Sequence, residues 1–388
     1  MQNYFSSDYK IGILGGGQLG KMMLYDARKF DIVTHVLESN TEAPSAIACN
    51  KFVYGDIQDY ETVVNFGKEV DLITFEIEAV NLQALQKLEE LGKTVYPSSA
   101  TLELIQSKQK QKKFYRENNI PTSPFTNFES LSELKSAYQN NEFKLPQVWK
   151  AATGGYDGKG VQVLKTESDF DKLVDAPCLI EEMIDFEMEL AVIVARNPSG
   201  EKKSYPVVEM EFHPEANQVE YVLSPARITD EIAQKARDLA ERVSQKFEHV
   251  GLLAIEFFLT KDGDILVNEV APRPHNSGHL TIEGNYTNQF EQHLRSILDL
   301  PLGDSSTKKP AVMVNLVGDE NHQGQVLYEN IDQIFALKGV TPHIYGKKET
   351  RPFRKMGHVT IINESIEEAR TMAEKVKKQI KVISDEKL

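Results

Sequence analysis

AIEFFLTKDGDILVNEVAPR, residues 254–273, is the stretch that decides the fold. Asp262 and Gly263 are a strong two-residue turn signal, and β-branched and aromatic residues flank them on both sides. The stretch therefore predicts a β-hairpin. A turn centred on these two residues pairs Lys261 with Asp264, and that pair sets the register of the two strands.

The same register places Glu256 opposite Glu269. Opposed residues on one face have Cβ atoms about 5 Å apart, and two carboxylates at that distance repel unless a cation or a proton lies between them. Mg²⁺ is the natural ion, with Mn²⁺ as a substitute, because it takes one or two carboxylates together with water and nucleotide phosphates. Solvated charges at a strand end are the alternative. Asn268 is a further candidate ligand, although strict alternation points it to the other face.

A glycine-rich segment, TGGYDGKG at residues 153–160, lies between the strand-like stretches LPQVWK and VQVLK. Four glycines within seven positions, beside Lys159, predict a mobile loop that folds over phosphates and offers backbone amides and a cation. Lys150 ends the preceding strand and is placed to reach the same phosphates. A β-hairpin with a flexible tip is the alternative.

A second glycine motif lies near the N-terminus, where Gly15, Gly17 and Gly20 follow the strand KIGIL and open a helix. Glu38 ends the next strand, which completes the pattern of a dinucleotide-binding loop. The physics of such a loop is generic, because any phosphate is favoured at the positive end of a helix. On these residues alone, a nicotinamide dinucleotide, another phosphate ligand, and a tight turn without a ligand all stay open.

The overall charge limits the classes of ligand. The 388 residues carry a formal net charge of −14, which argues against a nucleic-acid partner. Any anionic ligand must be held by a local basic cluster, and one such cluster lies near the C-terminus: Lys347, Lys348, Arg351, Arg354 and Lys355. The cluster suits one phosphate monoester, and a solvated basic loop is the alternative. Arg273, His275 and His279 follow the predicted metal strand and suggest a bicarbonate site.

The chain is long enough for two or three domains. Short strands alternate with helices over the first hundred residues, which predicts a parallel sheet. We expect domains at residues 1–106, 107–302 (with a lid subdomain at about 121–186) and 303–388. Cys49 and Cys178 do not suggest a disulfide framework, and the sequence has neither a signal pattern nor an apolar run long enough for a membrane. We therefore expect a cytoplasmic protein with no membrane partner.

Five motifs in order resemble the ATP-grasp superfamily, and within it the N5-carboxyaminoimidazole ribonucleotide synthetase family. They are GGGQLGKMM, TFEIE, GGYDGKG, NEVAPRPHNSGH and YGKKETRPFRKMGHV. The similarity covers nearly the whole chain. It implies an ATP-grasp fold of mixed α/β and α+β class, with an N-terminal Rossmann-like domain with a parallel sheet and a small, mostly β C-terminal domain.

The resemblance also implies roles for individual residues. It assigns ATP contacts to Lys108, Lys150, Gly155, Tyr156, Asp157, Gly158, Lys159, Gly160, Val161, Glu181, Glu182, Met183, Ile184, Glu189, His213, Asn268 and Glu269. It assigns the metal to Glu256, Asn268 and Glu269. It assigns the substrate nucleotide to Gln18, Leu19, Glu76, Lys347, Arg354 and Lys355, with Lys348 as an alternative to Lys347. It assigns the chemistry at bicarbonate to Tyr156, Asp157, Lys159, Arg273, His275 and Asn276.

The reaction implied by the family is ATP-dependent carboxylation of aminoimidazole ribonucleotide with bicarbonate, in purine synthesis. Bicarbonate would attack the γ-phosphorus of ATP, and the resulting carboxyphosphate would carboxylate the amine while the glycine loop excludes water. The family also implies a homodimer. Three alternatives stay open: a ligase acting on glycinamide ribonucleotide, a nicotinamide dehydrogenase, and a non-catalytic nucleotide-binding protein.

Overall fold

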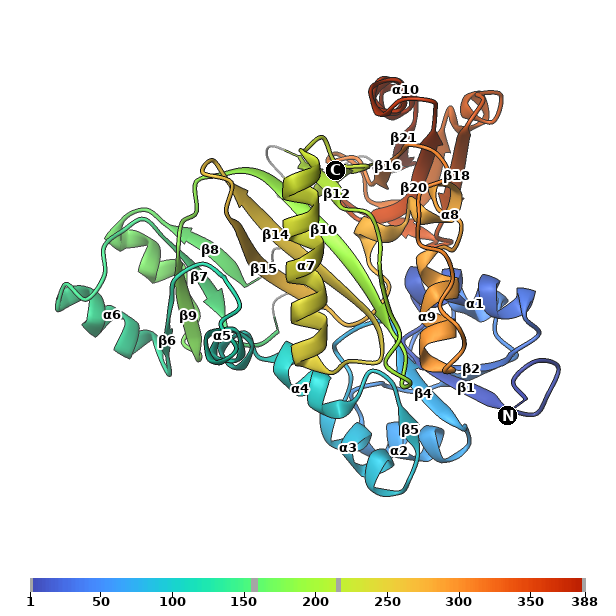
Figure 1. Ribbon diagram of the computed structural model, residues 1–388, viewed down its shortest axis with the longest axis horizontal. Helices are drawn as coiled ribbons and strands as arrows, with labels where there is room; N and C mark the ends of the chain where they lie inside the picture. The colour runs from blue at the N-terminus through green and yellow to red at the C-terminus, as the bar shows by residue number, and fades with distance from the viewer. Residues whose placement is uncertain (1–2, 155–159, 214–217, 386–388) are drawn as a thin grey trace.

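The computed structural model describes residues 3–154, 160–213 and 218–385 (Figure 1). The N-terminal part is a five-stranded parallel sheet in the order β3-β2-β1-β4-β5, which confirms the prediction. Its elements are β1 (Lys10–Leu14), α1 (Gln18–Lys29), β2 (Val33–Glu38), η1 (Pro44–Ile47), β3 (Lys51–Tyr54), α2 (Tyr60–Lys68), β4 (Leu72–Phe75), α3 (Leu82–Glu90), β5 (Thr94–Val95) and α4 (Ser99–Gln106).

Helices cover both faces of this sheet. Ile11 and Ile13 of β1 pack with α1 on one face, whereas Leu14 packs with α2 and α3 on the other. Burial on both faces explains the continuous apolar runs of the strands. The strand order reverses between β1 and β4, and the first glycine motif leaves β1 at that point, where open parallel sheets bind ligands.

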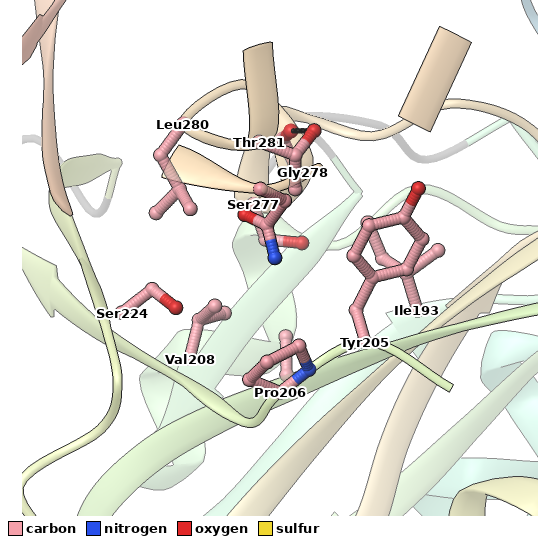
Figure 2. A pocket seen from close by; sticks show the side chains of 11 residues that line it. Ile193, Tyr205, Pro206, Val208, Ser224, Ser277, Gly278, Leu280 and Thr281 are labelled. Atoms are coloured by element: carbon pink, nitrogen blue, oxygen red, sulfur yellow. Dashed lines mark hydrogen bonds between the residues drawn. The ribbon is translucent and has the colours of Figure 1, made fainter. Parts of the chain in front are cut away.

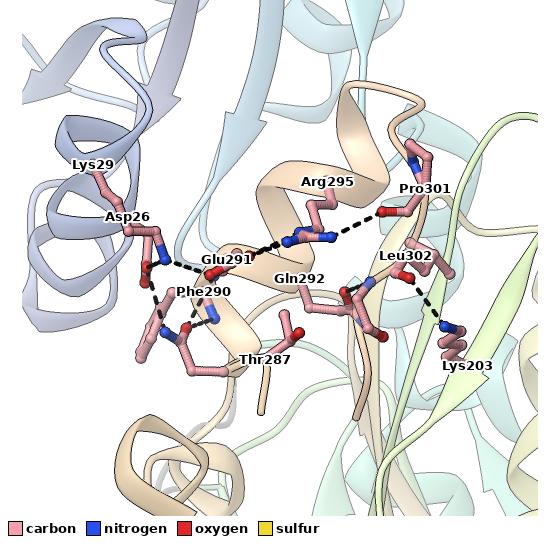
Figure 3. A network of polar contacts seen from close by, with 12 residues as sticks. Asp26, Lys29, Lys203, Thr287, Phe290, Glu291, Gln292, Arg295, Pro301 and Leu302 are labelled. Atoms are coloured by element: carbon pink, nitrogen blue, oxygen red, sulfur yellow. Dashed lines mark hydrogen bonds and ion pairs between the residues drawn. The ribbon is translucent and has the colours of Figure 1, made fainter. Parts of the chain in front are cut away.

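A helix from far along the chain completes the N-terminal core. This helix is α9 (Gln289–Ile297), and the short helices η3 (Asn276–Gly278) and α8 (Thr281–Gly284) precede it. Phe290 and Leu294 of α9 pack in the same cluster as Ile11. Glu291 pairs with Lys29 of α1 and with Arg295 of its own helix, as Figure 3 shows. The N-terminal sheet is therefore attached to the rest of the molecule through an apolar and an ionic contact.

The central sheet has nine strands, and its paired strands are antiparallel. The first group comprises β10 (Phe186–Arg196), β11 (Lys202–Ser204), β12 (Val208–Phe212), β13 (Val219–Ser224), β14 (Gly251–Thr260) and β15 (Ile265–Ala271), with helix α7 (Asp230–Phe247). Leu190, Val192 and Val194 pack under α7. Side chains alternate along a strand, so Glu189 and Ala191 point to the opposite face.

The opposite face is covered over only part of its length. Ile193 and Val208 of this face lie against the segment of residues 277–281, which includes Leu280. The small pocket between them measures about 10 Å³ (Figure 2). A space of that size holds at most one water molecule. The half of the face that carries Glu189 is not covered by this segment, and the candidate site lies there.

A smaller antiparallel sheet, in the order β6-β9-β7-β8, stands beside the central one. It comprises β6 (Phe125–Phe128), α6 (Leu131–Gln139), β7 (Gln147–Ala151), β8 (Val161–Leu164), η2 (Glu167–Lys172) and β9 (Cys178–Glu182), and helix α5 (Lys108–Glu117) leads into it. Its own core includes Trp149, Phe170 and Ile180. Figure 1 shows it projecting from one side of the molecule.

The C-terminal part is mostly β, as predicted. It contains β16 (Ala311–Val317), β17 (Gly324–Glu329), η4 (Ile331–Ile334), β18 (Val340–Ile344), β19 (Glu349–Thr350), β20 (Lys355–Ile362), α10 (Ile366–Gln379) and β21 (Lys381–Ser384). Because β13 pairs with β16, the central sheet continues into this part. Within the described chain, no helix has both the length and the apolar character needed to cross a membrane.

Candidate active site

The hairpin of residues 254–273 is present, but its turn differs from the prediction. Thr260 pairs with Asp264: the Thr260 amide donates to the Asp264 carbonyl at 2.9 Å, and the Gly263 amide donates to the Thr260 carbonyl at 3.0 Å. The predicted pair of Lys261 with Asp264 is therefore wrong by one residue. Gly263 has a φ of +83° and closes a three-residue loop, which a residue without Cβ allows.

A β-bulge in β15 cancels this offset. Ile255 is opposite Val270, and Phe257 is opposite Val267, so two residues of β15 face the single residue Glu256. Those two residues are Asn268 and Glu269. Val267 and Val270 both pack in the core under α7 although they are three positions apart. The bulge therefore turns both intervening side chains to the other face, and the expectation that alternation points Asn268 away is wrong.

The carboxylates on this face repel one another. Burial raises the pKa of Glu256 well above its usual range, and the nearby Glu269 and Glu189 raise it further. Burial, followed by Glu269, raises the pKa of Glu189 to about 7. Like charges that are held close together favour a cation between them.

These donors fit Mg²⁺. Two carboxylates and the amide oxygen of Asn268 match an ion that takes few protein ligands and completes its octahedron with phosphates and water. Among the residues that the structure describes, no group of three or more His, Cys, Asp and Glu side chains is arranged as a metal site. Phosphate oxygens of a bound nucleotide would have to supply the remaining ligands.

Lysines from the small sheet and from α5 face these acids. Lys150 Nζ lies 3.3 Å from Asn268 Oδ1 and 3.0 Å from Glu181 Oε1. Lys108 Nζ lies 3.8 Å from Glu269 Oε2. Although burial raises the pKa of Glu181, Lys150 and Lys112 lower it below its usual value. The structure thus brings the predicted phosphate-binding lysines to the predicted metal ligands.

The other predicted ATP residues lie on several elements. Glu182, Met183 and Ile184 follow Glu181 where the chain passes from β9 to β10, and they are exposed or half-buried. Val161 begins β8, and Gly160 directly precedes it. His213 lines a cleft of about 240 Å³ that also includes Asn315 and Phe353. The predicted residues Gly155, Tyr156, Asp157, Gly158 and Lys159 lie outside the described parts of the chain.

The segment after β15 places polar groups beside Glu256. His275 Nε2 lies 3.6 Å from Glu256 Oε1. Arg273 Nε lies 2.8 Å from Glu78 Oε1. Asn276 exchanges hydrogen bonds with Asn315 of β16 at 3.0 and 3.1 Å. His279 is instead fully buried, and its Nδ1 lies 2.9 Å from the Gln289 amide nitrogen, so the structure gives it a core position.

The first glycine motif is occupied by the protein itself. The Glu76 carboxylate accepts hydrogen bonds from the amides of Gly17 at 2.6 Å and Gly20 at 2.8 Å. These amides are the ones that a pyrophosphate would need, so the geometry argues against the dinucleotide alternative. Gln18 and Leu19 form the first turn of α1 beside this contact, with Leu19 buried.

The C-terminal basic cluster is divided. Lys347 Nζ donates to the Lys355 carbonyl at 2.7 Å, so these two predicted residues lie together. Arg354 donates to the Glu349 carbonyl at 2.7 Å. Lys348 is exposed and forms an ion pair with Glu42.

Comparison with known proteins decides the family. Residues 9–106 match the ribonucleotide synthetase preATP-grasp domain, residues 113–290 the ATP-grasp domain, and residues 311–372 the phosphoribosylaminoimidazole carboxylase C-terminal domain. The chain is 39% identical over 363 residues to the N5-carboxyaminoimidazole ribonucleotide synthase of Bacillus subtilis (strain 168), a match that covers 92% of each chain. The chain belongs to the N5-carboxyaminoimidazole ribonucleotide synthase family.

Solved structures of family members have the same fold. The crystal structure of the Thermotoga maritima synthetase is 42% identical, with a TM-score of 0.89, and the match covers 97% of this chain and 100% of that chain. The Aspergillus clavatus synthase, solved with ADP and 5-aminoimidazole ribonucleotide, is 32% identical with a TM-score of 0.86, covering 96% and 99%. The chain spans 64% of the longer Vigna aconitifolia and Saccharomyces cerevisiae relatives.

Two buried lysines in this member of the synthase family were not predicted from its sequence. Lys112 of α5 contacts Glu181 at 3.2 Å, and Lys21 of α1 donates to the carbonyls of Ile344 and Tyr345 at 3.1 Å each. Lys112 stands in the run KQKQKK, which suggests an exposed helix. Its spacing from Lys108 and Tyr115, four and three positions, is the available signal that it shares their face.

Proposed function

We propose that the protein uses ATP to carboxylate 5-aminoimidazole ribonucleotide with bicarbonate, forming N5-carboxyaminoimidazole ribonucleotide, ADP and phosphate in purine synthesis. One observation carries the proposal: the bulge turns Asn268 and Glu269 toward Glu256, while Lys150 contacts Asn268 from the small sheet at 3.3 Å. This arrangement suits phosphates bound between two sheets. Family membership supports the choice of acceptor.

In the first step, an oxygen of bicarbonate bonds to the γ-phosphorus of ATP. The bond from that phosphorus to the bridging oxygen breaks, and its electron pair leaves with ADP. Lys108 and Lys150 would neutralise charge on the phosphates and hold them in line. Glu256, Asn268 and Glu269 would hold Mg²⁺, which supplies positive charge to the phosphate oxygens when it is bound.

In the second step, the amine nitrogen of the substrate bonds to the carboxyl carbon of carboxyphosphate, directly or after release of carbon dioxide. The bond from that carbon to the phosphate oxygen breaks, phosphate leaves, and the nitrogen loses a proton. Arg273 and His275 lie beside Glu256 and would bind the carboxylate group. Asn276, Tyr156, Asp157 and Lys159 are proposed for the same step, the last three from the family resemblance alone.

The substrate nucleotide is proposed to bind between the N-terminal sheet and the C-terminal basic cluster. Gln18 and Leu19 of α1 would contact it together with Glu76, which directly follows β4. Its phosphate would bind to Lys347, Arg354 and Lys355. Among these, Lys347 is favoured over Lys348, because the latter is exposed and already paired with Glu42.

The test is phosphate release from ATP, measured with and without aminoimidazole ribonucleotide and bicarbonate. We expect release to require both, and N5-carboxyaminoimidazole ribonucleotide to form in equal amount. Glu269→Gln serves as the control, because it removes a proposed metal ligand and keeps the shape of the side chain. Release that does not depend on the nucleotide would refute the proposed acceptor. EDTA should abolish release, and Mg²⁺ or Mn²⁺ should restore it.

The remaining expectations are proposals of the same kind. We propose domains at residues 1–106, 107–302 and 303–388, with the smaller subdomain at about 121–186. We also propose a cytoplasmic homodimer with no nucleic-acid partner. Light scattering on the purified protein tests the dimer, and a single-subunit mass at micromolar concentration would contradict it.

A further inference from the structure

Two lysines share one buried carboxylate oxygen where the small sheet meets the central sheet. Lys112 Nζ and Lys150 Nζ lie 3.2 and 3.0 Å from Glu181 Oε1. The exposed fractions of the three side chains are 2% for Lys112, 12% for Lys150 and 3% for Glu181. The trio therefore carries one positive charge in excess in a poorly solvated place, a state that an incoming anion would relieve.

The two lysines are held differently. Lys112 Nζ donates to the Thr122 hydroxyl at 2.6 Å, and that hydroxyl donates to the Val267 carbonyl at 2.7 Å. Lys112 is therefore fixed to the strand that carries the bulge. Lys150 is the more exposed of the pair, and it also contacts Asn268 Oδ1, on the face proposed to bind nucleotide. Lys150 can leave Glu181 for a phosphate, whereas Lys112 cannot.

We propose that Lys112 is a positioning residue whose permanent ion pair with Glu181 allows Lys150 to move from that carboxylate to the phosphates of a bound nucleotide. The proposal rests on the ATP site of the proposed function. It concerns nucleotide binding and does not involve the carboxylated substrate.

The reason is the charge left behind. When Lys150 moves to a phosphate, Glu181 keeps Lys112 as a counterion and stays paired. Without Lys112, the same movement would strand a buried carboxylate, which is strongly unfavourable. Burial lowers the pKa of Lys112 to about 8, with Glu181 opposing this shift and Lys150 adding to it, which agrees with two cations crowded around one anion.

The experiment compares ADP affinity, measured by calorimetry with Mg²⁺ present, and the KM for ATP among the wild type and five variants. Lys112→Met should weaken ADP binding and raise the KM for ATP by about tenfold or more. The KM for aminoimidazole ribonucleotide should change less than about twofold. Lys113→Met is the matched control, because Lys113 is the next residue of the same helix, its side chain is 70% exposed, and it pairs with the exposed Glu117 at 3.8 Å. It should behave as the wild type.

A charge-neutral background separates this role from a merely structural one. In Glu181→Gln no carboxylate can be stranded, so adding Lys112→Met should weaken ADP binding by less than about threefold. Lys112→Arg should keep most of the affinity, and it gives a second comparison if Lys112→Met does not fold. Equal losses with and without the Glu181 charge, or equal behaviour of Lys112→Met and Lys113→Met, would overturn the proposal. Because ADP binding needs no acceptor, this result is independent of whether the proposed reaction is correct.

Discussion

The carboxylate of Glu76 accepts a hydrogen bond from the backbone amide of Gly17 at 2.6 Å, at the N-terminus of α1. A Cβ added at Gly17 would lie 2.6 Å from the same carboxylate, so the glycine is needed for this close approach. The motif that suggests a dinucleotide site is therefore filled by an acidic side chain that directly follows β4.

Because these amides are already bonded, we expect no saturable binding of NADH in a fluorescence titration. Glu76→Gln should lower the free energy of unfolding by about 1 to 3 kcal/mol, since an amide accepts less well from two buried N–H groups. Urea denaturation measures this loss. An unchanged free energy of unfolding would show that the two hydrogen bonds contribute nothing, and saturable NADH binding would restore the dinucleotide alternative.

The repulsion between Glu269 and Glu256 predicts opposite effects on stability and activity. Glu269→Gln should stabilise the metal-free protein by up to about 1 kcal/mol, because it removes a like charge at a half-exposed position. The same change should lower ATP-dependent phosphate release by about a hundredfold or more, since a proposed metal ligand is lost. A variant that is both more stable and fully active would remove Glu269 from the proposed metal site.

The bulge itself can be tested by deleting Asn268. Deletion leaves Val267, Glu269 and Val270 in regular alternation, with both valines still in the core. We expect a folded protein whose melting temperature changes by only a few degrees. Phosphate release should fall at least about tenfold, because the amide oxygen that faces Lys150 is gone. If the deleted protein keeps full activity, the bulge has no part in the site. Asn268→Ala is the control that keeps the bulge.

Glu189 predicts a pH dependence. Its pKa is raised to about 7 in the folded protein, above the usual value near 4.5, so the folded state binds the proton more tightly than the unfolded chain does. This contribution to stability is complete below about pH 4.5 and is lost as the pH rises through about 7. The wild type should therefore lose roughly 2 to 3 kcal/mol relative to Glu189→Gln over this range, in urea denaturation with EDTA present. A difference in the free energy of unfolding between the two proteins that stays constant with pH would contradict the raised pKa of Glu189.

Lys347 and Lys348 should differ as substrate contacts. Lys347 Nζ donates a hydrogen bond to the backbone carbonyl of Lys355 at 2.7 Å, whereas Lys348 is exposed and paired with Glu42. Lys347→Ala should raise the KM for aminoimidazole ribonucleotide by about tenfold, and Lys348→Ala by less than about twofold. Steady-state kinetics at saturating ATP distinguishes them, and the reverse order would assign the phosphate to Lys348.

The placement of the two acids was predictable, but partly through compensation. The hairpin count puts Glu256 opposite Glu269, and the structure agrees because an extra residue in the turn is offset by an extra residue in the bulge. Turn signals and alternation are local, so they show that both strands exist and are joined. They do not show where a strand gains a residue, because packing against α7 decides which side chains enter the core.

The amino-acid sequence by itself determined the parallel N-terminal sheet, the hairpin, the glycine motifs and the family, because periodicity, turn chemistry and motif order act over a few residues at a time. Only the tertiary structure decided that Glu76 fills the first glycine motif, 56 and 59 positions from the amides it bonds, and that Lys112 shares Glu181 with Lys150. Such contacts depend on how sheets and helices pack. Buried charged groups are then paired, because an unpaired charge out of water is strongly unfavourable.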